Sequence, residues 1–151
     1  MNTIVNQLQE SFQYYHVQIY LWDEEEKNLR LKGGTGEPGR SMLARHHQIA
    51  AGRGLVGRAA ESNQVILVSD TISDPSWLPN PLLPDTRSEA AVPISIGDDV
   101  LGVLDVQHDH TNALLEDDVQ LLQAIANQIA VAIQTQRPMR EPNRKPANKR
   151  S

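Results

Sequence analysis

The sequence predicts an α+β fold in which helices cover both faces of a sheet built from hairpins. Residues 92–96 alternate in polarity, residues 97–99 form a polar turn, and residues 100–106 return as a strand that is apolar on both faces. A strand of that kind needs cover on each side of its sheet. Apolar residues at helical spacing near both ends of the chain supply two of the covering elements.

The N-terminal part predicts a helix over residues 3–13 that leads into a strand over residues 15–23. Aliphatic side chains occupy one face of this strand, which suits a helix layer. The other face carries His16, Gln18, Tyr20 and Trp22. It suits either the wall of a pocket or cross-strand packing. A charged turn at residues 24–28 leads into a second strand at residues 29–33.

The middle of the chain predicts shorter elements. We expect a helical turn at residues 41–45, a strand at 47–50, a helix at 55–62 and a buried strand at 65–68. Residues 70–87 contain four prolines and predict a long loop, which in a compact domain is usually functional or disordered. The tryptophan and leucines of this loop argue against disorder, so we expect it to fold over something.

The last predicted element is a long helix with two apolar stripes. The first stripe contains Leu115, Val119, Leu122, Ala126, Ile129 and Ile133. The second contains Leu121, Ile125 and Ala132. The first stripe fits the helix's own sheet and the second fits a partner helix, so the helix is either a dimer seam or a widely buried helix of a monomer.

Length and charge indicate one acidic domain, which we place at residues 1–136, followed by a tail at residues 137–151. The tail has six basic residues, one acid and three prolines, and we expect it to be disordered. The net charge of −5 for the whole chain leaves −10 for residues 1–136, which makes nucleic acid an unexpected partner. Neither an export signal nor a membrane-spanning run is present, so we expect a cytoplasmic protein without a membrane partner.

The motifs that carry chemistry are few. The chain has no cysteine, which excludes thiol catalysis, cysteine-bound zinc and thioether-linked chromophores. Residues 52–57 match G-x-G-x-x-G without the strand–helix–strand frame of a dinucleotide site, so we interpret these glycines as a tight turn and close helix packing. His108 and His110 share a strand face only if the strand extends that far, and no third ligand stands at metal spacing. We therefore expect no metal, no cofactor and no enzymatic activity.

Two carboxylates are the first candidates for a ligand site. Asp105 lies in the apolar strand and, by alternation, shares a face with Leu101 and Val103, while Glu89 precedes the neighbouring strand. A charge in that setting needs a partner, a ligand or an edge open to water. The alternative is a strand-end carboxylate that caps a backbone N–H group.

The order of these elements resembles a GAF domain over residues 4–136. The resemblance is carried by residues 15–21, 52–60, 68–70, 80–84, 87–89, 92–94 and 101–107. It implies a central antiparallel sheet of about six strands, with the terminal helices on one face. Small helices and a pocket loop are implied on the other face. Family members often begin the last helix with Ser or Thr, whereas Leu115 stands there in this chain, so we expect a weaker cap.

GAF domains differ in what they bind: cyclic nucleotides, bilins, haem, amino acids, oxo acids or nothing. GAF-like free methionine sulfoxide reductases also carry an Arg-Ser-Glu segment and a Leu-Asp pair whose acids hold the substrate. Glu89 and Asp105 match those acids, but the catalytic cysteines have no counterpart. The resemblance implies binding without that chemistry. The candidate ligand-binding residues are Glu89, Asp105, Arg87, Ser88, Tyr20, Trp77 and Asp70.

Two functions follow from the resemblance. In the first, a sensory module closes residues 70–87 over an unknown small molecule, and occupancy changes how the terminal helices pair in a homodimer. A histidine kinase or cyclase output domain would then read the change, from another chain or a longer parent. In the second, the pocket binds nothing and the domain is a dimerising scaffold.

Overall fold

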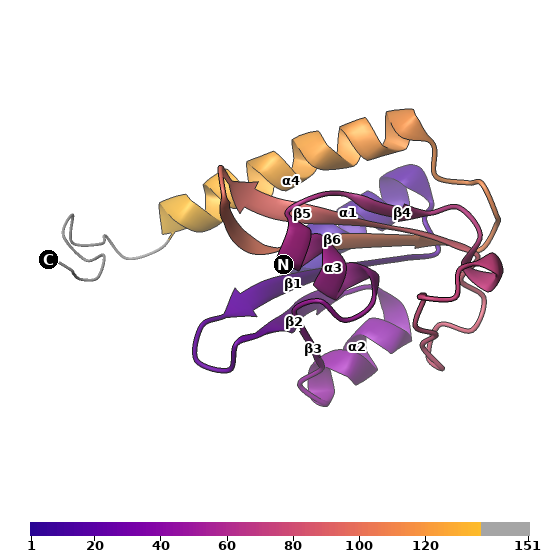
Figure 1. Ribbon diagram of the computed structural model, residues 1–151, viewed down its shortest axis with the longest axis horizontal. Coiled ribbons are helices and arrows are strands. Elements are labelled where there is room, and N and C mark those ends of the chain that lie inside the picture. Colours follow the sequence, from indigo (N-terminus) through magenta and orange to yellow (C-terminus); the bar gives the residue numbers. More distant parts are fainter. Residues whose placement is uncertain (137–151) are drawn as a thin grey trace, which may run out of the picture.

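A six-stranded antiparallel sheet forms the middle layer of the computed structural model, which describes residues 1–136 (Figure 1). The strands lie in the order β3-β2-β1-β6-β5-β4. Their bounds are β1 His16–Asp23, β2 Asn28–Gly34, β3 Gln48–Ala50, β4 Ile66–Val68, β5 Ser88–Ile96 and β6 Asp99–His108. The predicted α+β class and both hairpins are confirmed. The prediction of a disordered tail concerns residues outside those described.

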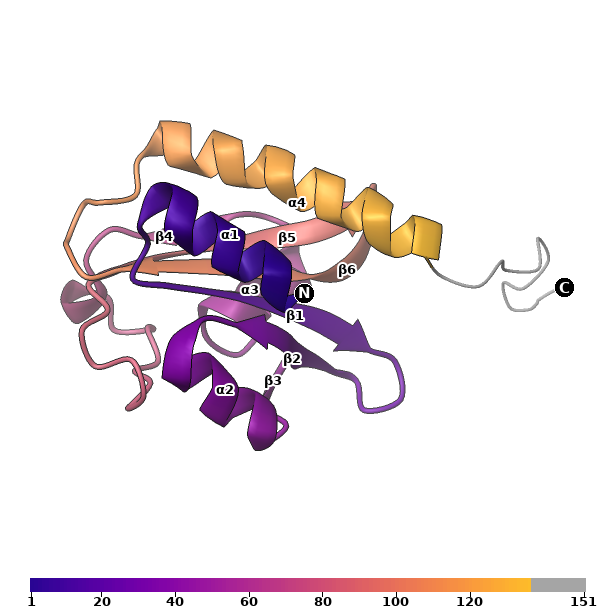
Figure 2. The ribbon, with the colours of Figure 1, turned by 180° about the vertical axis from the view of Figure 1, so that it is seen from behind.

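The terminal helices α1 (Asn2–Phe12) and α4 (Glu116–Gln136) cover one face of the sheet, as Figure 2 shows. This helix-side face is apolar, because Val17 and Ile19 of β1 pack with buried residues of both helices. The buried residues of α4 follow the first predicted stripe and include Leu122 and Ala126. None of the helices within residues 1–136 has the length and hydrophobicity of a membrane span.

The opposite face carries α2 (Gly36–Ala44), α3 (Gly54–Ser62) and the connection that contains the 3₁₀ helix η1 (Thr71–Ser73). We call it the cavity-side face. Its core combines Tyr20, Leu29 and Val103 of the sheet with Met42 of α2 and Leu55 of α3. Together the two faces give the sheet the double cover that the apolar strand predicts.

Helix α2 begins earlier than the sequence pattern indicates. Its first residues include Pro38, and proline is tolerated in a first turn because its missing N–H would lack an intrahelical partner there. Gly39 then lies so close to Gly34 of β2 that an added Cβ would stand 2.1 Å from backbone. The glycines therefore permit close contact between helix and strand here.

The glycines of residues 52–57 fit the interpretation as a turn and a packing site. Gly52 and Gly54 have φ of +85° and +65°, which favour glycine. An added Cβ on Gly57 would stand 2.5 Å from the carbonyl oxygen of Ala50. The segment packs α3 against β3 through these close contacts.

Two local expectations are wrong. Leu101 packs on the helix side, away from Asp105, because Ile94 pairs with Gly102 and Ser95 with Val100, which leaves Leu101 as an extra residue in the ladder. Leu115 precedes α4 and is 61% exposed. The helix start is also held better than expected, since the Leu115 N–H donates to Asp118 Oδ2 at 2.8 Å.

Candidate functional site

A cavity of about 500 Å³ lies on the cavity-side face of the sheet. Its floor is formed by β1, β5 and β6 through Gln18, Tyr20, Glu89 and Gln107. Its walls come from α2, β3, the start of α3 and residues 77–82. A volume of this order is typical of small-molecule sites.

Residues 77–82 form one wall, so the long connection folds over the cavity as its apolar residues predict. Trp77 is half-buried, and its indole Nε1 donates to Glu89 Oε1 at 2.8 Å. Asn80 contacts α2, with Nδ2 at 3.4 Å from Met42 Sδ. These contacts fix the wall to the floor and to a neighbouring helix.

The floor holds two buried carboxylates tied together by amides. Glu89 is 6% exposed and Asp105 is fully buried. The Gln107 Nε2 donates to Asp105 Oδ2 at 2.8 Å and to Glu89 Oε2 at 3.3 Å. Gln18, which pairs with Asp105 in the β1–β6 ladder, donates to the same Oδ2 at 2.9 Å. Asp105 lies behind the lining residues and acts on the cavity through these amides.

The two carboxylates interact electrostatically. Burial, together with the charge of Asp105 and a hydrogen bond to it, raises the pKa of Glu89 well above its usual range, and the Trp77 hydrogen bond opposes this only in part. Asp105 Oδ1 is buried and has no hydrogen-bond partner within residues 1–136. The floor therefore favours either a proton on Glu89 or a cation beside the pair.

The polar network continues beneath the floor. His16 Nε2 lies 3.0 Å from Gln18 Oε1, and Thr35 Oγ1 lies 3.2 Å from His16 Nδ1. Burial lowers the pKa of His16, although Gln18 and Asp105 act in the opposite direction. Burial also raises the pKa of Tyr20 well above its usual value, so this floor residue keeps its phenol proton.

The cavity lining has basic groups opposite the floor. Arg45 and Arg53 line it and are exposed residues. His47 lies between them in the sequence, and its pKa is lowered by burial and by the charge of Arg45. The cavity thus combines an acidic floor with two arginines among its lining residues, a pattern that suits a ligand with charges of both signs.

The structure brings some predicted site residues together and leaves others apart. Tyr20, Trp77 and Glu89 line the cavity, and Asp105 supports it. The exposed Arg87 does not line it, contrary to the expectation that Arg87 converges with the carboxylates, because its backbone bonds to His108 and Thr71 fix this end of β5.

Asp70 and Ser88 also lie outside the cavity lining. The Asp70 carboxylate caps η1, accepting from the Ile72 N–H and the Ser73 hydroxyl. The Ser88 hydroxyl donates to the carbonyl of His110 at 2.8 Å. Both side chains are therefore engaged in local structure.

Sequence reasoning missed most of the polar lining. Gln107, Arg45 and Arg53 were not candidates, and Gln18 appeared only as one member of the polar face of β1. The detectable signal for Gln107 was its position two residues after Asp105, on the same face of the same strand. Asp109 lies between His108 and His110, and one ligand atom from each of the three residues lies within 4.8 Å of the others, so a third candidate ligand stands beside the two imidazoles.

Comparison with known proteins decides the family. The family model for the GAF domain matches residues 1–134. The chain belongs to the GAF domain family. GAF domains are commonly sensory or regulatory parts of signalling proteins. No curated protein matches the chain.

Solved structures with the same fold include enzymes and signalling domains. The type II free methionine-R-sulfoxide reductase of Thermoplasma acidophilum is 26% identical with a TM-score of 0.76, over 89% of this chain and 90% of that one. The enzyme of Neisseria meningitidis, solved with its substrate, is 25% identical with a TM-score of 0.76, over 87% and 74%. The GAF domain of a Coxiella burnetii phosphoenolpyruvate-protein phosphotransferase has a TM-score of 0.78 at 21% identity, over 87% and 79%, which shows the fold alone.

These matches correct the expectation that the chain is not an enzyme. Two of the similar GAF-fold structures are reductases, so membership of this fold does not argue against catalysis. The expectation rested on missing sequence motifs, whereas a GAF pocket assembles its chemistry from residues on separate strands. The lack of cysteine excludes only thiol chemistry by these 151 residues.

Proposed function

We propose that this GAF domain is a sensory module that binds a small zwitterion of amino-acid type. The single observation that carries the proposal is the buried Glu89–Asp105 pair on the cavity floor, where Asp105 Oδ1 has no partner within residues 1–136. An ammonium group beside Glu89 supplies the missing positive charge and takes the place of the carboxyl proton.

The opposite charge of the ligand has its own partners. Arg45 and Arg53 line the cavity, and a guanidinium group can bind a carboxylate in a bidentate manner. Apolar side chains between the two ends, such as Met42 and Leu55, suit an uncharged middle portion. A ligand with an ammonium group, a short apolar part and an acid therefore matches the distribution of groups.

The reductase neighbours support the same ligand class. Their names state that they act on free methionine sulfoxide, an amino acid, and one was solved with its substrate. The chain is about a quarter identical to these reductases in sequence. We therefore take them as support for the class of ligand.

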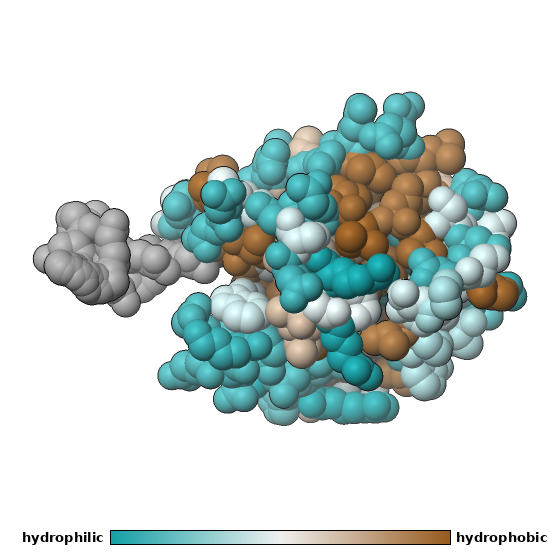
Figure 3. Space-filling model, viewed as in Figure 1, coloured by the Kyte–Doolittle hydropathy of each residue, from teal (hydrophilic) through white to brown (hydrophobic). Residues whose placement is uncertain are grey.

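For the sensory role, we propose that occupancy changes dimerisation through the terminal helices. Helix α4 packs mainly on β5, the strand that also carries Glu89, so a change at the floor acts directly on the sheet beneath α4. Apolar surface gathers below the first half of α4 and over β4 (Figure 3). Leu121 of α4 and Leu67 of β4 are 37% and 38% exposed. An exposed apolar area of this kind supports association with a second copy.

Thermal-shift measurement tests the binding. The panel contains amino acids including methionine sulfoxide, amines without a carboxylate, and carboxylates without an amine. We expect zwitterions to raise the melting temperature of the wild type and to have little effect on Glu89→Gln. Glu61→Gln, an exposed acid of α3 outside the lining, is the matched control and should respond like the wild type.

The outcomes separate the candidate functions. A response to simple carboxylates but not to zwitterions would contradict the ammonium site. No response to any compound would favour the scaffold function, in which the pocket binds nothing. Incubating each hit with the protein and following it by NMR shows whether the bound compound is also converted.

Sedimentation velocity with and without the hit tests the coupling. We expect the ligand to change the monomer–dimer equilibrium of the wild type, and Leu121→Arg to weaken association. Gln120→Arg adds the same charge at an exposed neighbouring position of α4 and is the matched control. An equilibrium that is unaffected by a bound ligand would leave binding intact and reject the coupling.

A further inference from the structure

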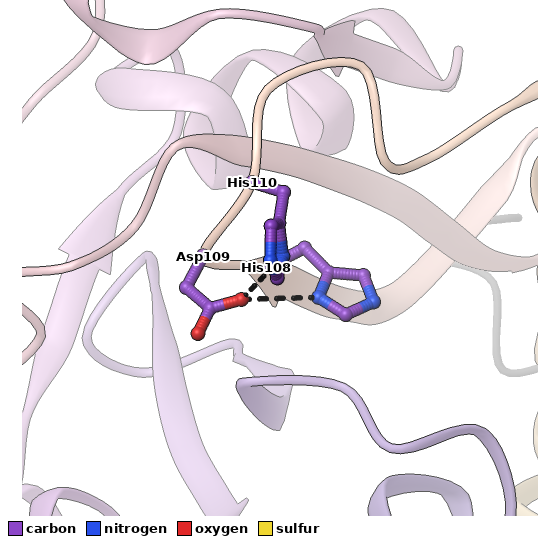
Figure 4. Close-up of side chains that lie close together, drawn as sticks. All are labelled: His108, Asp109 and His110. Atoms are coloured by element: carbon purple, nitrogen blue, oxygen red, sulfur yellow. Dashed lines mark ion pairs between the residues drawn. The ribbon is translucent and has the colours of Figure 1, made fainter.

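A second group of ligand-type side chains lies at the end of β6, outside the cavity lining. Asp109 Oδ1 is 2.7 Å from His110 Nδ1 and 3.7 Å from His108 Nδ1. One ligand atom from each of the three residues lies within 4.8 Å of the others. Figure 4 shows both imidazoles beside the Asp109 carboxylate.

Backbone contacts fix the segment that carries these side chains. The carbonyl of His108 accepts from the Arg87 N–H at 2.8 Å, and the carbonyl of His110 accepts from the Ser88 hydroxyl at 2.8 Å. Two residues later, the Asn112 N–H donates to the carbonyl of Ser69 at 2.8 Å. These contacts hold the backbone that carries the three ligand-type side chains, so the side chains project from a fixed segment.

One atom of the group lacks a partner. His108 Nδ1 is buried and has no hydrogen-bond partner within residues 1–136, and the His108 ring packs edge-on against Tyr14 with centroids 5.5 Å apart. A buried nitrogen without a partner carries a desolvation cost that a bound cation would remove. His110 and Asp109 have side chains that are 74% and 45% exposed, so an ion can reach the site from solvent.

We propose that His108, Asp109 and His110 form a binding site for a divalent transition-metal ion, with Zn²⁺ as the probe. Atoms that share a tetrahedral metal at bond lengths near 2.1 Å lie about 3.4 Å apart, and the separations of Asp109 Oδ1 from the two imidazole Nδ1 atoms, 2.7 and 3.7 Å, bracket that spacing. Two imidazoles and one carboxylate suit zinc, nickel or copper, whereas calcium and magnesium prefer all-oxygen sites. Both imidazoles bind in the neutral form through Nδ1, and water completes the coordination.

Calorimetric titration of the full chain with Zn²⁺ tests the proposal. We expect one ion to bind per chain. Asp109→Asn and His110→Ala should each lower the Zn²⁺ affinity by at least ~10–100-fold, the loss that follows when a residue outside the metal's own ligands is removed. Both replaced side chains are largely exposed, so the variants should fold. His46→Asn removes an exposed imidazole elsewhere, at a φ of +56° that Asn tolerates, and should bind like the wild type.

A second readout locates the ion. Paramagnetic Co²⁺ should broaden the NMR signals of the His108 and His110 rings and leave those of His46 and His47 sharp. Equal Zn²⁺ affinity in the wild type, Asp109→Asn and His110→Ala would overturn the proposal. So would Co²⁺ broadening centred on His46 or His47.

Discussion

The two faces of the sheet use the same strands for different purposes. Along β1, Val17 and Ile19 point to the helix side and join an apolar core, whereas Gln18 and Tyr20 point to the cavity side. The helix-side cluster contains apolar side chains and Tyr14, while the cavity side carries buried carboxylates and amides. Strand alternation thus lets one sheet bury an almost wholly apolar core on one face and place its buried carboxylates and amides on the other.

The polar groups around the two carboxylates largely satisfy one another, although Asp105 Oδ1 has no hydrogen-bond partner within residues 1–136. Gln18 and Gln107 donate to Asp105, and Trp77 and Gln107 donate to Glu89. Buried polar groups that are hydrogen-bonded cost little, whereas a partner left alone costs much more. The comparison therefore predicts different responses to side-chain removal on the two faces.

The largest effect should come from the helix side. Leu122→Ala removes a fully buried side chain of α4 and should lower the free energy of unfolding by about 3 kcal/mol. Leu121→Ala, at the next position and 37% exposed, should cost about 1 kcal/mol or less. Urea denaturation measures both. Similar losses of unfolding free energy in the two variants would mean that α4 does not bury the side that carries Leu122.

On the cavity side, Asp105→Ala should act through unpaired partners. The Gln18 amide loses its acceptor and Gln107 keeps only its 3.3 Å hydrogen bond to Glu89, so we expect the free energy of unfolding to fall by about 2 kcal/mol. Asp99→Ala removes an exposed acid from the same strand and should change it by about 0.5 kcal/mol or less. A stable Asp105→Ala protein would show that the network contributes nothing to folding.

The pH dependence of the unfolding free energy should reveal the buried carboxylate of the cavity-side face without any change in packing. The pKa of Glu89 is raised in the folded state, so the folded chain keeps a proton that the unfolded chain releases. Stability from this group is therefore complete below the usual carboxyl range and is lost as pH rises through the raised pKa. Urea titrations from acidic to basic pH should show this decline in the wild type and a smaller one in Glu89→Gln. Parallel curves would contradict the raised pKa.

The periodicity of the sequence predicts the elements that alternate cleanly. Residues 15–23 and the first stripe of α4 have a plain period, and the structure confirms the strand and the buried helix face. The bulge at Leu101 breaks the period of two, so alternation assigned that side chain to the wrong face. The early start of α2 was hidden by Pro38 and glycines that usually mark loops.

The candidate site was predictable only in part, for a related reason. A carboxylate in an apolar strand stands out, so Glu89 and Asp105 were found. Arg45 and Arg53 lie in short connecting segments whose direction depends on tertiary packing, and no local pattern indicates it. Arg87 illustrates the opposite error, a residue that was expected at the site and does not line it. It lies two residues before Glu89 in the sequence, but this closeness does not bring its side chain to the cavity.

The smallest predicted effect concerns the start of α4 and asks whether the two faces are independent in the free protein. Asp118→Ala removes the acceptor of the Leu115 N–H and should cost about 1 kcal/mol of unfolding free energy. Asp117→Ala removes a charge from the same turn, where Asp117 does not accept the Leu115 N–H, and is the matched control for the helix dipole. In a Trp22→Phe background, Trp77 fluorescence reports on the cavity wall and should be the same in both variants. A shift of Trp77 emission in Asp118→Ala alone would mean that loosening the helix side disturbs the cavity. The two faces of the sheet would then not be independent of each other.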